Sequence, residues 1–309
     1  MAWLPHFGVE NASVFRMILR IAAVVVAFSS YALAQFFSLA TDAGGSRLYF
    51  ATPLRQKNTA QPTYGKLFRM DSSGLNLQES RIVQPPEPVP SGIAGVGIYH
   101  LSNAYDLRAV DVSSDGQVVA STGFRDCIGD IALCSKGADG YVTTITIGSR
   151  SEDYVGNLRL SAIGKWAFGG GTGEPHYSSI YGHLVNLTTG EQIPQTTLSA
   201  GKFQVATSGR PVANDGTAVF SDSQAVVILQ GTQTRRIPTQ NHDQPNDAVI
   251  DTSAQTIVYS VSANIGSNGV VSPSGPKSLH VADAATGEST MIASDGYAPS
   301  LSYDGNTVL

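Results

Sequence analysis

The chain has 309 residues, and 14% of them are Asp, Glu, Lys or Arg, against roughly 25% in a typical soluble protein. So low a share of charge argues against a disordered acidic or basic tail protein. The 32 glycines and 15 prolines argue against coiled coils and helical bundles. A net charge of -5 offers no basic surface for phosphate backbones, so nucleic acid is not expected as a partner.

The N-terminal segment has the order of a secretory signal. Arg16 and Arg20 precede an apolar run over residues 21–28, and the small-x-small sequence Ala-Leu-Ala follows at residues 32–34. We predict a signal peptide over residues 1–34, with Met17 as an alternative start, and an exported chain, periplasmic or secreted. A membrane anchor is the competing interpretation because residues 21–41 carry no charge. A membrane is therefore a partner only if this segment is retained.

A glycine corner recurs along residues 35–309. Each copy has an apolar residue four positions before the corner and two apolar residues shortly after it. From Gly116 on, the corners lie about 40–50 residues apart, which is the length of a four-stranded propeller blade. Asp-Gly suits such a corner because glycine tolerates positive φ and aspartate can accept hydrogen bonds from turn amides. The corner residues are Gly116, Gly164, Gly216, the decayed copy at Ala254, and Gly305, with a looser copy at Gly45.

The segments between the corners have the alternation of strands. Residues 67–74, 183–190 and 278–287 each run as an alternating strand into a glycine turn, and residues 141–147 and 225–229 occupy the same place in the other repeats. Almost no helical periodicity is present. The sequence therefore predicts an all-β propeller of four-stranded blades. Five full blades are expected, at residues 36–85, 105–150, 155–198, 203–240 and 247–293, followed by the start of a sixth.

The corner and the strands after it carry a family resemblance. An apolar-x-x-Asp-Gly corner, two strands and a Thr-Gly or Ser-Gly turn resemble the WD-repeat-like propellers of the TolB type in bacterial periplasmic proteins. That family usually has proline before Asp-Gly, where this chain has Ser114, Asn214 and Tyr303. The resemblance covers nearly all of residues 36–309 and implies six or seven blades in the complete ring. The sixth repeat stops within its second strand, so we expect the propeller domain, residues 35–309, to be truncated at its C-terminus.

The long, irregular segments belong to two kinds of connection. Residues 85–103 and 238–247 link blades, and residues 124–140, 169–182 and 263–277 join second to third strands. In an up-and-down blade both kinds emerge on the same face, where a rigid scaffold can present variable loops. We predict a ligand or protein site there. Its candidate residues are Arg125, Asp126, His176, Tyr177, His242 and Asp243.

No catalytic or metal motif is visible in the chain. The six histidines form no His-x-His or His-Glu-x-x-His pattern, and a Gly-x-Ser-x-Gly nucleophile elbow is absent. We therefore predict no catalytic residues, no metal and no cofactor. In an exported protein Cys127 and Cys134 would close a loop disulfide, with free thiols as the alternative.

The predicted function is that of an exported, non-catalytic propeller that binds a protein, peptide or glycan through its loop-rich face. The alternative is the propeller domain of a larger enzyme, since similar propellers precede the hydrolase domain of prolyl-oligopeptidase-like serine peptidases. A catalytic domain would then lie beyond residue 309. A lyase or glycosidase acting at the propeller centre is a third possibility, and it would need paired carboxylates that face each other.

Overall fold

The computed structural model describes residues 38–52, 66–82, 106–125, 140–155, 157–172, 180–194, 205–206, 209–222, 224–239, 243–262, 277–303 and 305–309. The predicted signal peptide and both cysteines lie outside these residues. The described part of the chain contains strands and turns and no helix. Accordingly, no helix within it is long and apolar enough to cross a membrane.

Five antiparallel sheets make up the described structure. Sheet one holds β1 (Ser38–Thr41), β2 (Arg47–Thr52), β3 (Lys66–Asp71) and β4 (Gln78–Ile82), and sheet two holds β5 (Asp106–Val112), β6 (Val118–Arg125), β7 (Gly140–Ile147) and β8 (Arg150–Val155). Sheet three holds β9 (Asn157–Leu160), β10 (Trp166–Thr172), β11 (Ile180–Asn186) and β12 (Gln192–Pro194). Sheet four holds β13 (Ala218–Ser221), β14 (Ala225–Gln230) and β15 (Gln233–Pro238), and sheet five holds β16 (Gln244–Ile250), β17 (Thr256–Ser262), β18 (Lys277–Asp283) and β19 (Ser289–Ala293).

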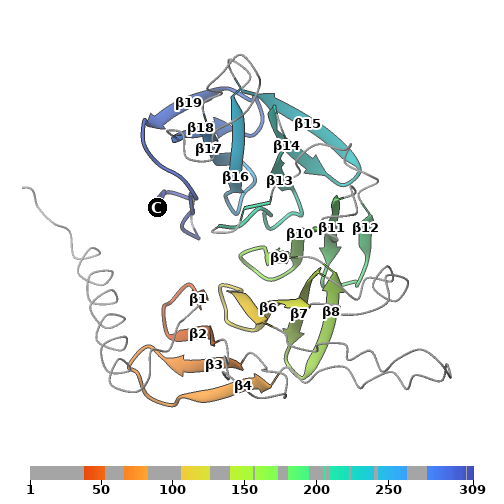
Figure 1. Ribbon diagram of the computed structural model, residues 1–309, viewed down its shortest axis with the longest axis vertical. Helices are drawn as coiled ribbons and strands as arrows, with labels where there is room; N and C mark the ends of the chain where they lie inside the picture. Colours follow the sequence, from red (N-terminus) through yellow and green to blue (C-terminus); the bar gives the residue numbers. More distant parts are fainter. Residues whose placement is uncertain are drawn as a thin grey trace, which may run out of the picture.

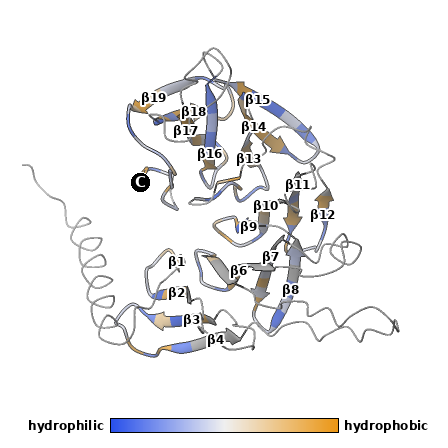
Figure 2. Ribbon diagram, viewed as in Figure 1, coloured by the Kyte–Doolittle hydropathy of each residue, from blue (hydrophilic) through white to orange (hydrophobic). Residues whose placement is uncertain are grey.

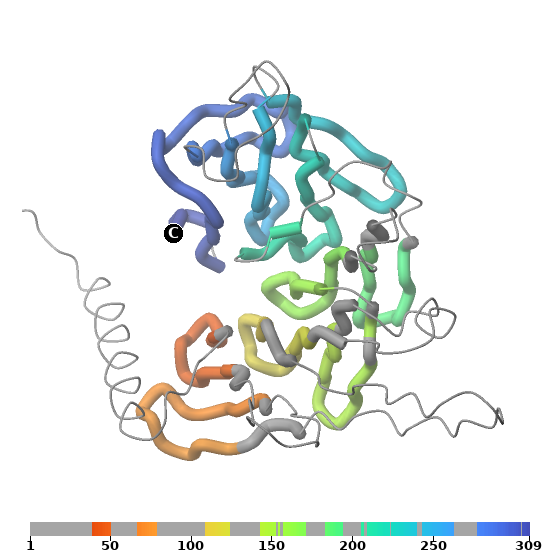
Figure 3. Tube along the Cα trace, viewed as in Figure 1, coloured from red at the N-terminus to blue at the C-terminus, as the bar shows by residue number. Residues whose placement is uncertain are grey.

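The sheets stand around a common centre in chain order, as Figure 1 shows, and the Cα trace in Figure 3 follows the same path from red to blue. Within each sheet, strands that follow one another in sequence are hydrogen-bonded neighbours. Each sheet is thus an up-and-down blade whose outermost strand is its last. The predicted all-β propeller is confirmed, and the five sheets lie where the repeat places five blades.

The core is divided into layers between neighbouring blades. Tyr49 and Leu67 of blade one pack with Val112 of blade two, and the other blade interfaces hold clusters of the same kind. Such burial contributes roughly 25 cal/mol per Å² of apolar surface. Figure 2 shows hydrophobic residues along β14, where all side chains but the last are buried, and hydrophilic residues along the outer strand β15. Blade-to-blade packing therefore holds the ring together.

The glycine corners form an inner ring of hydrogen bonds. Gly116 has a φ of 71° and Gly216 a φ of 93°, as the turn requires, and Ala254 adopts the same conformation with a φ of 60° in the decayed copy. Neighbouring corners are bonded directly: the Ala43 amide donates to the Ser114 carbonyl at 3.0 Å, and the Ser114 amide donates to the Ala162 carbonyl at 2.6 Å. Three corners are thereby linked in succession around one centre.

The blade boundaries differ from the prediction in three places. Strand β8 extends blade two to Val155, beyond the expected end at residue 150, because the tight turn at Gly148 allows a full return strand. Strand β16 begins at Gln244, before the expected start of blade five at residue 247. Within the described residues blade four has three regular strands, and its inner strand is reduced to a bridge between Val212 and Ala218. Pro211 lacks an N–H group for a ladder bond, which explains the weak inner strand.

The last described residues form a short hairpin at the sixth corner. The amide of Ser300 donates to the carbonyl of Leu309, and the amide of Leu309 donates to the carbonyl of Ser300, both at 2.9 Å. Leu301 and Val308 of this hairpin pack against Val258 of blade five. The predicted start of a sixth repeat therefore lies beside blade five, and the total number of blades stays a prediction.

Candidate functional site

Most of the predicted loop-face residues lie outside the described part of the chain. Asp126, His176, Tyr177 and His242 belong to this group, as do Cys127 and Cys134. Arg125 is the last residue of β6 and pairs with Gly140 of β7, so its backbone lies where the long connection between these strands begins. Asp243 directly precedes β16. Both described candidates therefore belong to the same end of the propeller.

This end, the loop-rich face, is the one at which β2 joins β3, β6 joins β7, β10 joins β11 and β17 joins β18. Blade five holds a group that the sequence did not indicate, midway along β17 and β18. His280 stacks on Tyr259 with ring centroids 5.4 Å apart, and its Nε2 atom lies 3.0 Å from Ser278 Oγ. Burial lowers the pKa of His280, and the negative charge of Asp243 partly opposes this shift. The imidazole is therefore neutral at pH 7.

The centre of the ring is occupied by Arg210. Its Nη1 atom donates to the Leu160 carbonyl at 2.9 Å, and its Nη2 atom donates to the Val112 carbonyl at 2.7 Å. The guanidinium also lies 3.3 Å from Asp111 Oδ1, and its Cζ atom lies 4.7 Å from the centroid of the Tyr303 ring. We refer to Arg210, Asp111 and Tyr303 as the central arginine cluster.

The remaining polar atoms of the cluster are committed to other blades. Asp111 accepts hydrogen bonds from the amides of Val112 and Leu160, both at 2.8 Å. Burial raises the pKa of Tyr303, so its hydroxyl stays protonated and donates to the Thr41 carbonyl of blade one at 3.0 Å. The cluster therefore joins the sixth corner to blades one to four.

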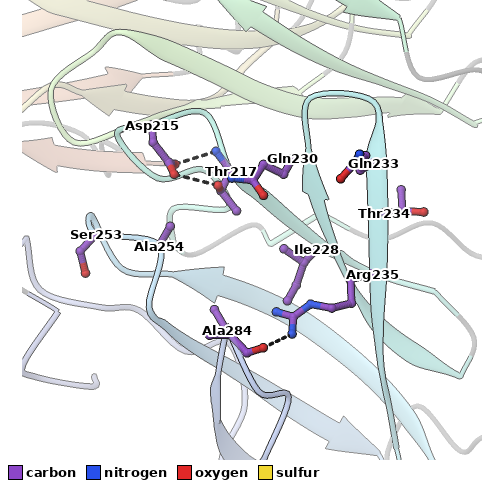
Figure 4. A pocket seen from close by; sticks show the side chains of 11 residues that line it. Asp215, Thr217, Ile228, Gln230, Gln233, Thr234, Arg235, Ser253, Ala254 and Ala284 are labelled. Carbon is purple, nitrogen blue, oxygen red and sulfur yellow. Dashed lines mark hydrogen bonds between the residues drawn. The ribbon is translucent and has the colours of Figure 1, made fainter.

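An open groove of about 500 Å³ lies between blades four and five. It belongs to the end opposite the loop-rich face, which we call the corner face because the glycine corners lie there. Blade four contributes Gln230, Gln233 and Arg235, as Figure 4 shows. Blade five contributes Ala254 and Ala284. Sequence reasoning missed this groove, because all of these residues lie in short turns or next to them.

The groove is polar at its rim and apolar at its floor. Asp215 accepts hydrogen bonds from the amide of Thr217 at 2.8 Å and from its hydroxyl at 3.0 Å, and Arg235 donates to the carbonyl of Ala285. The side chains of Gln230 and Gln233 are exposed and make no hydrogen bond within the described residues. The groove thus offers two free amide groups beside a balanced pair of charges.

No group of three or more His, Cys, Asp or Glu side chains within the described ranges could hold a metal ion. The groove and the central cluster contain no His or Cys. The groove and the central arginine cluster therefore offer a ligand hydrogen-bonding groups and a shaped surface.

Comparisons with known proteins concern the fold. No family model matches the sequence, and neither does any curated protein. Among solved structures, the chain is similar to TolB from Acinetobacter baumannii, with 13% identity, a TM-score of 0.48 and coverage of 95% of this chain and 63% of that one. The chain thus spans less than two thirds of that protein. A protein assigned as TolB from Agrobacterium tumefaciens gives the same identity and TM-score, with 88% of each chain covered.

A peptidase propeller is also similar. An acylaminoacyl peptidase in complex with Z-Gly-Gly-Phe-chloromethyl ketone shares 11% identity at a TM-score of 0.47, over 85% of this chain and 39% of that one. The propeller fold of this chain rests on its own five sheets and their strand order, which agree with the repeat in the sequence.

Proposed function

We propose that the chain is an exported, non-catalytic β-propeller that binds a protein, peptide or glycan through its loop-rich face. The observation that supports this most is the asymmetry between the two ends of the ring. At the corner face the connections are tight turns, such as Gly231 between β14 and β15. At the loop-rich face, longer stretches separate the paired strands of four blades, for example residues 126–139 between β6 and β7, whereas residues 222–224 join β13 to β14 in blade four. Elaborated connections on a rigid scaffold are where binding residues gather.

The non-catalytic part of the proposal follows from the central arginine cluster. Its charged groups are bound to backbone atoms of several blades, so they stabilise the ring, and the cluster itself offers no unbonded acid–base pair among the described residues. A propeller that acts as a rigid platform needs no more chemistry than shape and hydrogen bonds. A hydrolytic reaction carried out by this chain alone would contradict the proposal.

Site-specific photo-crosslinking tests the proposed face. A photoreactive amino acid is placed at Arg125 or at His242, and the full chain is produced in a bacterial host. Adducts with a partner are expected from these two positions. The matched controls are Gln117 and Thr188, which are exposed on turns of the corner face. Adducts from the control positions alone would place binding on the corner face and overturn the proposal.

Export is tested separately with a reporter enzyme that is active only outside the cytoplasm. Residues 1–40 fused to alkaline phosphatase lacking its own signal should give active, processed enzyme, because a charged start, an apolar run and a small-x-small site are the elements of a cleaved signal. Replacing Arg16 and Arg20 by glutamate should reduce this activity. An inactive wild-type fusion would remove export from the proposal and leave the binding face in place.

A further inference from the structure

Two turns at the corner face are equivalent in the hydrogen bonds of their backbones. In blade three the amide of Leu187 donates to the Lys165 carbonyl at 2.8 Å, and in blade five the amide of Ala284 donates to the Gln255 carbonyl at 2.7 Å. Both turns then close on a glycine: Gly190 donates to the Asn186 carbonyl and Gly287 to the Asp283 carbonyl, each at 2.8 Å. Leu187 and Ala284 therefore occupy the same place in their blades.

The facing walls are equivalent too. In blade two Ile147 pairs with Arg150 at the turn between β7 and β8. In blade four Gln230 pairs with Gln233 at the turn between β14 and β15. The next pair on the same face is Ile145 with Glu152 in blade two and Ile228 with Arg235 in blade four. The two interfaces thus share one backbone arrangement and differ in their side chains.

The difference in side chains decides whether the space is filled. Between blades two and three, Leu187 packs with Ile145 and Tyr154, and a cavity of only about 10 Å³ remains. Between blades four and five, Ala284 stands in the place of Leu187, and a groove of about 500 Å³ is open. The space falls within the roughly 300–1,000 Å³ typical of ligand sites. The groove is therefore not a consequence of the shared backbone arrangement, because the equivalent space between blades two and three is filled.

The groups in the groove indicate what it would hold. Arg235 and Asp215 are the two charged side chains that line the groove and have opposite signs, so the groove has no net charge to favour a charged ligand. The free hydrogen-bonding groups are the primary amides of Gln230 and Gln233, each of which can both donate and accept. Ile228, Ala254 and Ala284 form a small apolar floor. An uncharged peptide with small apolar side chains matches these amides and this apolar floor.

The kind of hydrogen bond available in the groove favours a peptide over a saccharide. Gln233 and Arg235 line the groove with side chains on the face of the sheet, whereas the free main-chain groups of β15, the last strand, lie along the edge of the sheet. Recognition in the groove therefore falls to the side-chain amides, whose N–H and C=O groups match those of a peptide main chain. A saccharide presents hydroxyl groups instead.

We propose that the groove between blades four and five is a second binding site, on the face opposite the loops, and that it takes an extended, uncharged peptide segment. The main chain of the peptide is bound by the side-chain amides of Gln230 and Gln233. A small side chain enters the space that Leu187 fills in the equivalent interface. This site is independent of the loop-rich face, and the closing experiment separates the two.

The experiment uses displayed random heptapeptides selected on the folded chain of residues 35–309. Binding of each selected peptide, labelled with a fluorophore, is then measured by anisotropy on wild type and on Ala284→Leu, which copies the residue of the filled interface. We expect binding to the variant to be at least about tenfold weaker. The matched control is Thr188→Leu. Thr188 follows Leu187 in the equivalent turn of blade three, outside the groove, so the affinity for the peptides should be unchanged.

A second variant keeps the test valid if Ala284→Leu misfolds. Gln230→Ala combined with Gln233→Ala changes only exposed side chains, and it should weaken the same peptides without affecting the fold. Peptides that bind wild type and both variants equally bind elsewhere, which overturns this site and leaves the loop-rich face in place. Selection of no peptide, or binding from a glycan array that Ala284→Leu abolishes, would overturn the peptide assignment.

Discussion

Replacing Arg210 by methionine tests whether the central arginine cluster holds the ring together. Methionine keeps most of the apolar stem and removes the guanidinium, whose contacts include the Val112 carbonyl at 2.7 Å and Asp111 at 3.3 Å. The side chains of Arg210 and Asp111 are only 18% and 12% exposed. Removing one partner of a buried pair costs about 3–5 kcal/mol, and the lower end of this range applies here because Asp111 keeps its attraction to the buried Arg159. We expect a loss of that size in the free energy of unfolding.

The matched control is Arg236→Met, which breaks an exposed ion pair. Arg236 lies 2.5 Å from Asp222, but its side chain is 55% exposed, and such pairs contribute only about 0–1 kcal/mol. Both variants are measured by urea unfolding, followed by the fluorescence of Trp166, the only tryptophan of residues 35–309. If Arg210→Met costs no more than Arg236→Met, the cluster does not stabilise the ring and the reasoning is wrong.

Three further predictions concern packing, the corners and pH. Leu187→Ala should lower the free energy of unfolding by about 2–5 kcal/mol because it opens a cavity. Ala284→Leu should raise the free energy of unfolding by about 0.5–2 kcal/mol because it fills one. If both variants shift the thermal unfolding midpoint in the same direction, the two sites are not equivalent. Gly231→Ala should cost about 1–2 kcal/mol for its positive φ alone, and Gly216→Ala should cost more, since its methyl group would lie 2.7 Å from Trp166 Cε2. Burial, and then the hydrogen bond to Glu152, raise the pKa of Tyr154 to about 12. The stability that this shift contributes is therefore complete below the pKa of about 10 in the unfolded chain. It is lost as the pH rises through about 12. Phenolate absorbance of wild type minus Tyr154→Phe should show this late titration, and a midpoint near that of a free tyrosine would refute it.

The corner repeat was readable from the sequence because each corner is a local structure. Gly116 and Gly216 require positive φ, and Asp115 accepts a hydrogen bond from the Gln117 amide two residues away at 3.0 Å. Contacts over so few residues leave a recognisable pattern, and the strands that follow show ordinary alternation. The end of blade two at Val155 was missed because β8 is polar and exposed over much of its length, so its alternation carries no hydrophobic signal.

The position before Asp-Gly shows what local pattern could not predict. Ser114, Asn214 and Tyr303 stand there in place of the proline of the TolB-type pattern, and the sequence offered no reason for them. In the structure the Ser114 and Asn214 amides donate to the next corner, to the carbonyls of Ala162 and Thr252, at 2.6 and 3.2 Å. A proline, which has no N–H group, could not do this. Tyr303 uses its side chain to reach blade one instead.

The amino-acid sequence by itself determined the all-β class, the corners and the spacing of the blades, since these depend on φ preferences, turn chemistry and alternation over a few residues. Only the tertiary structure decided the sites. Arg210 meets Tyr303 across 93 residues of chain, and the groove depends on Ala284 of one blade facing Gln230 of another. Such contacts form only when blades pack side by side, so no stretch of sequence short enough to show a pattern contains both partners.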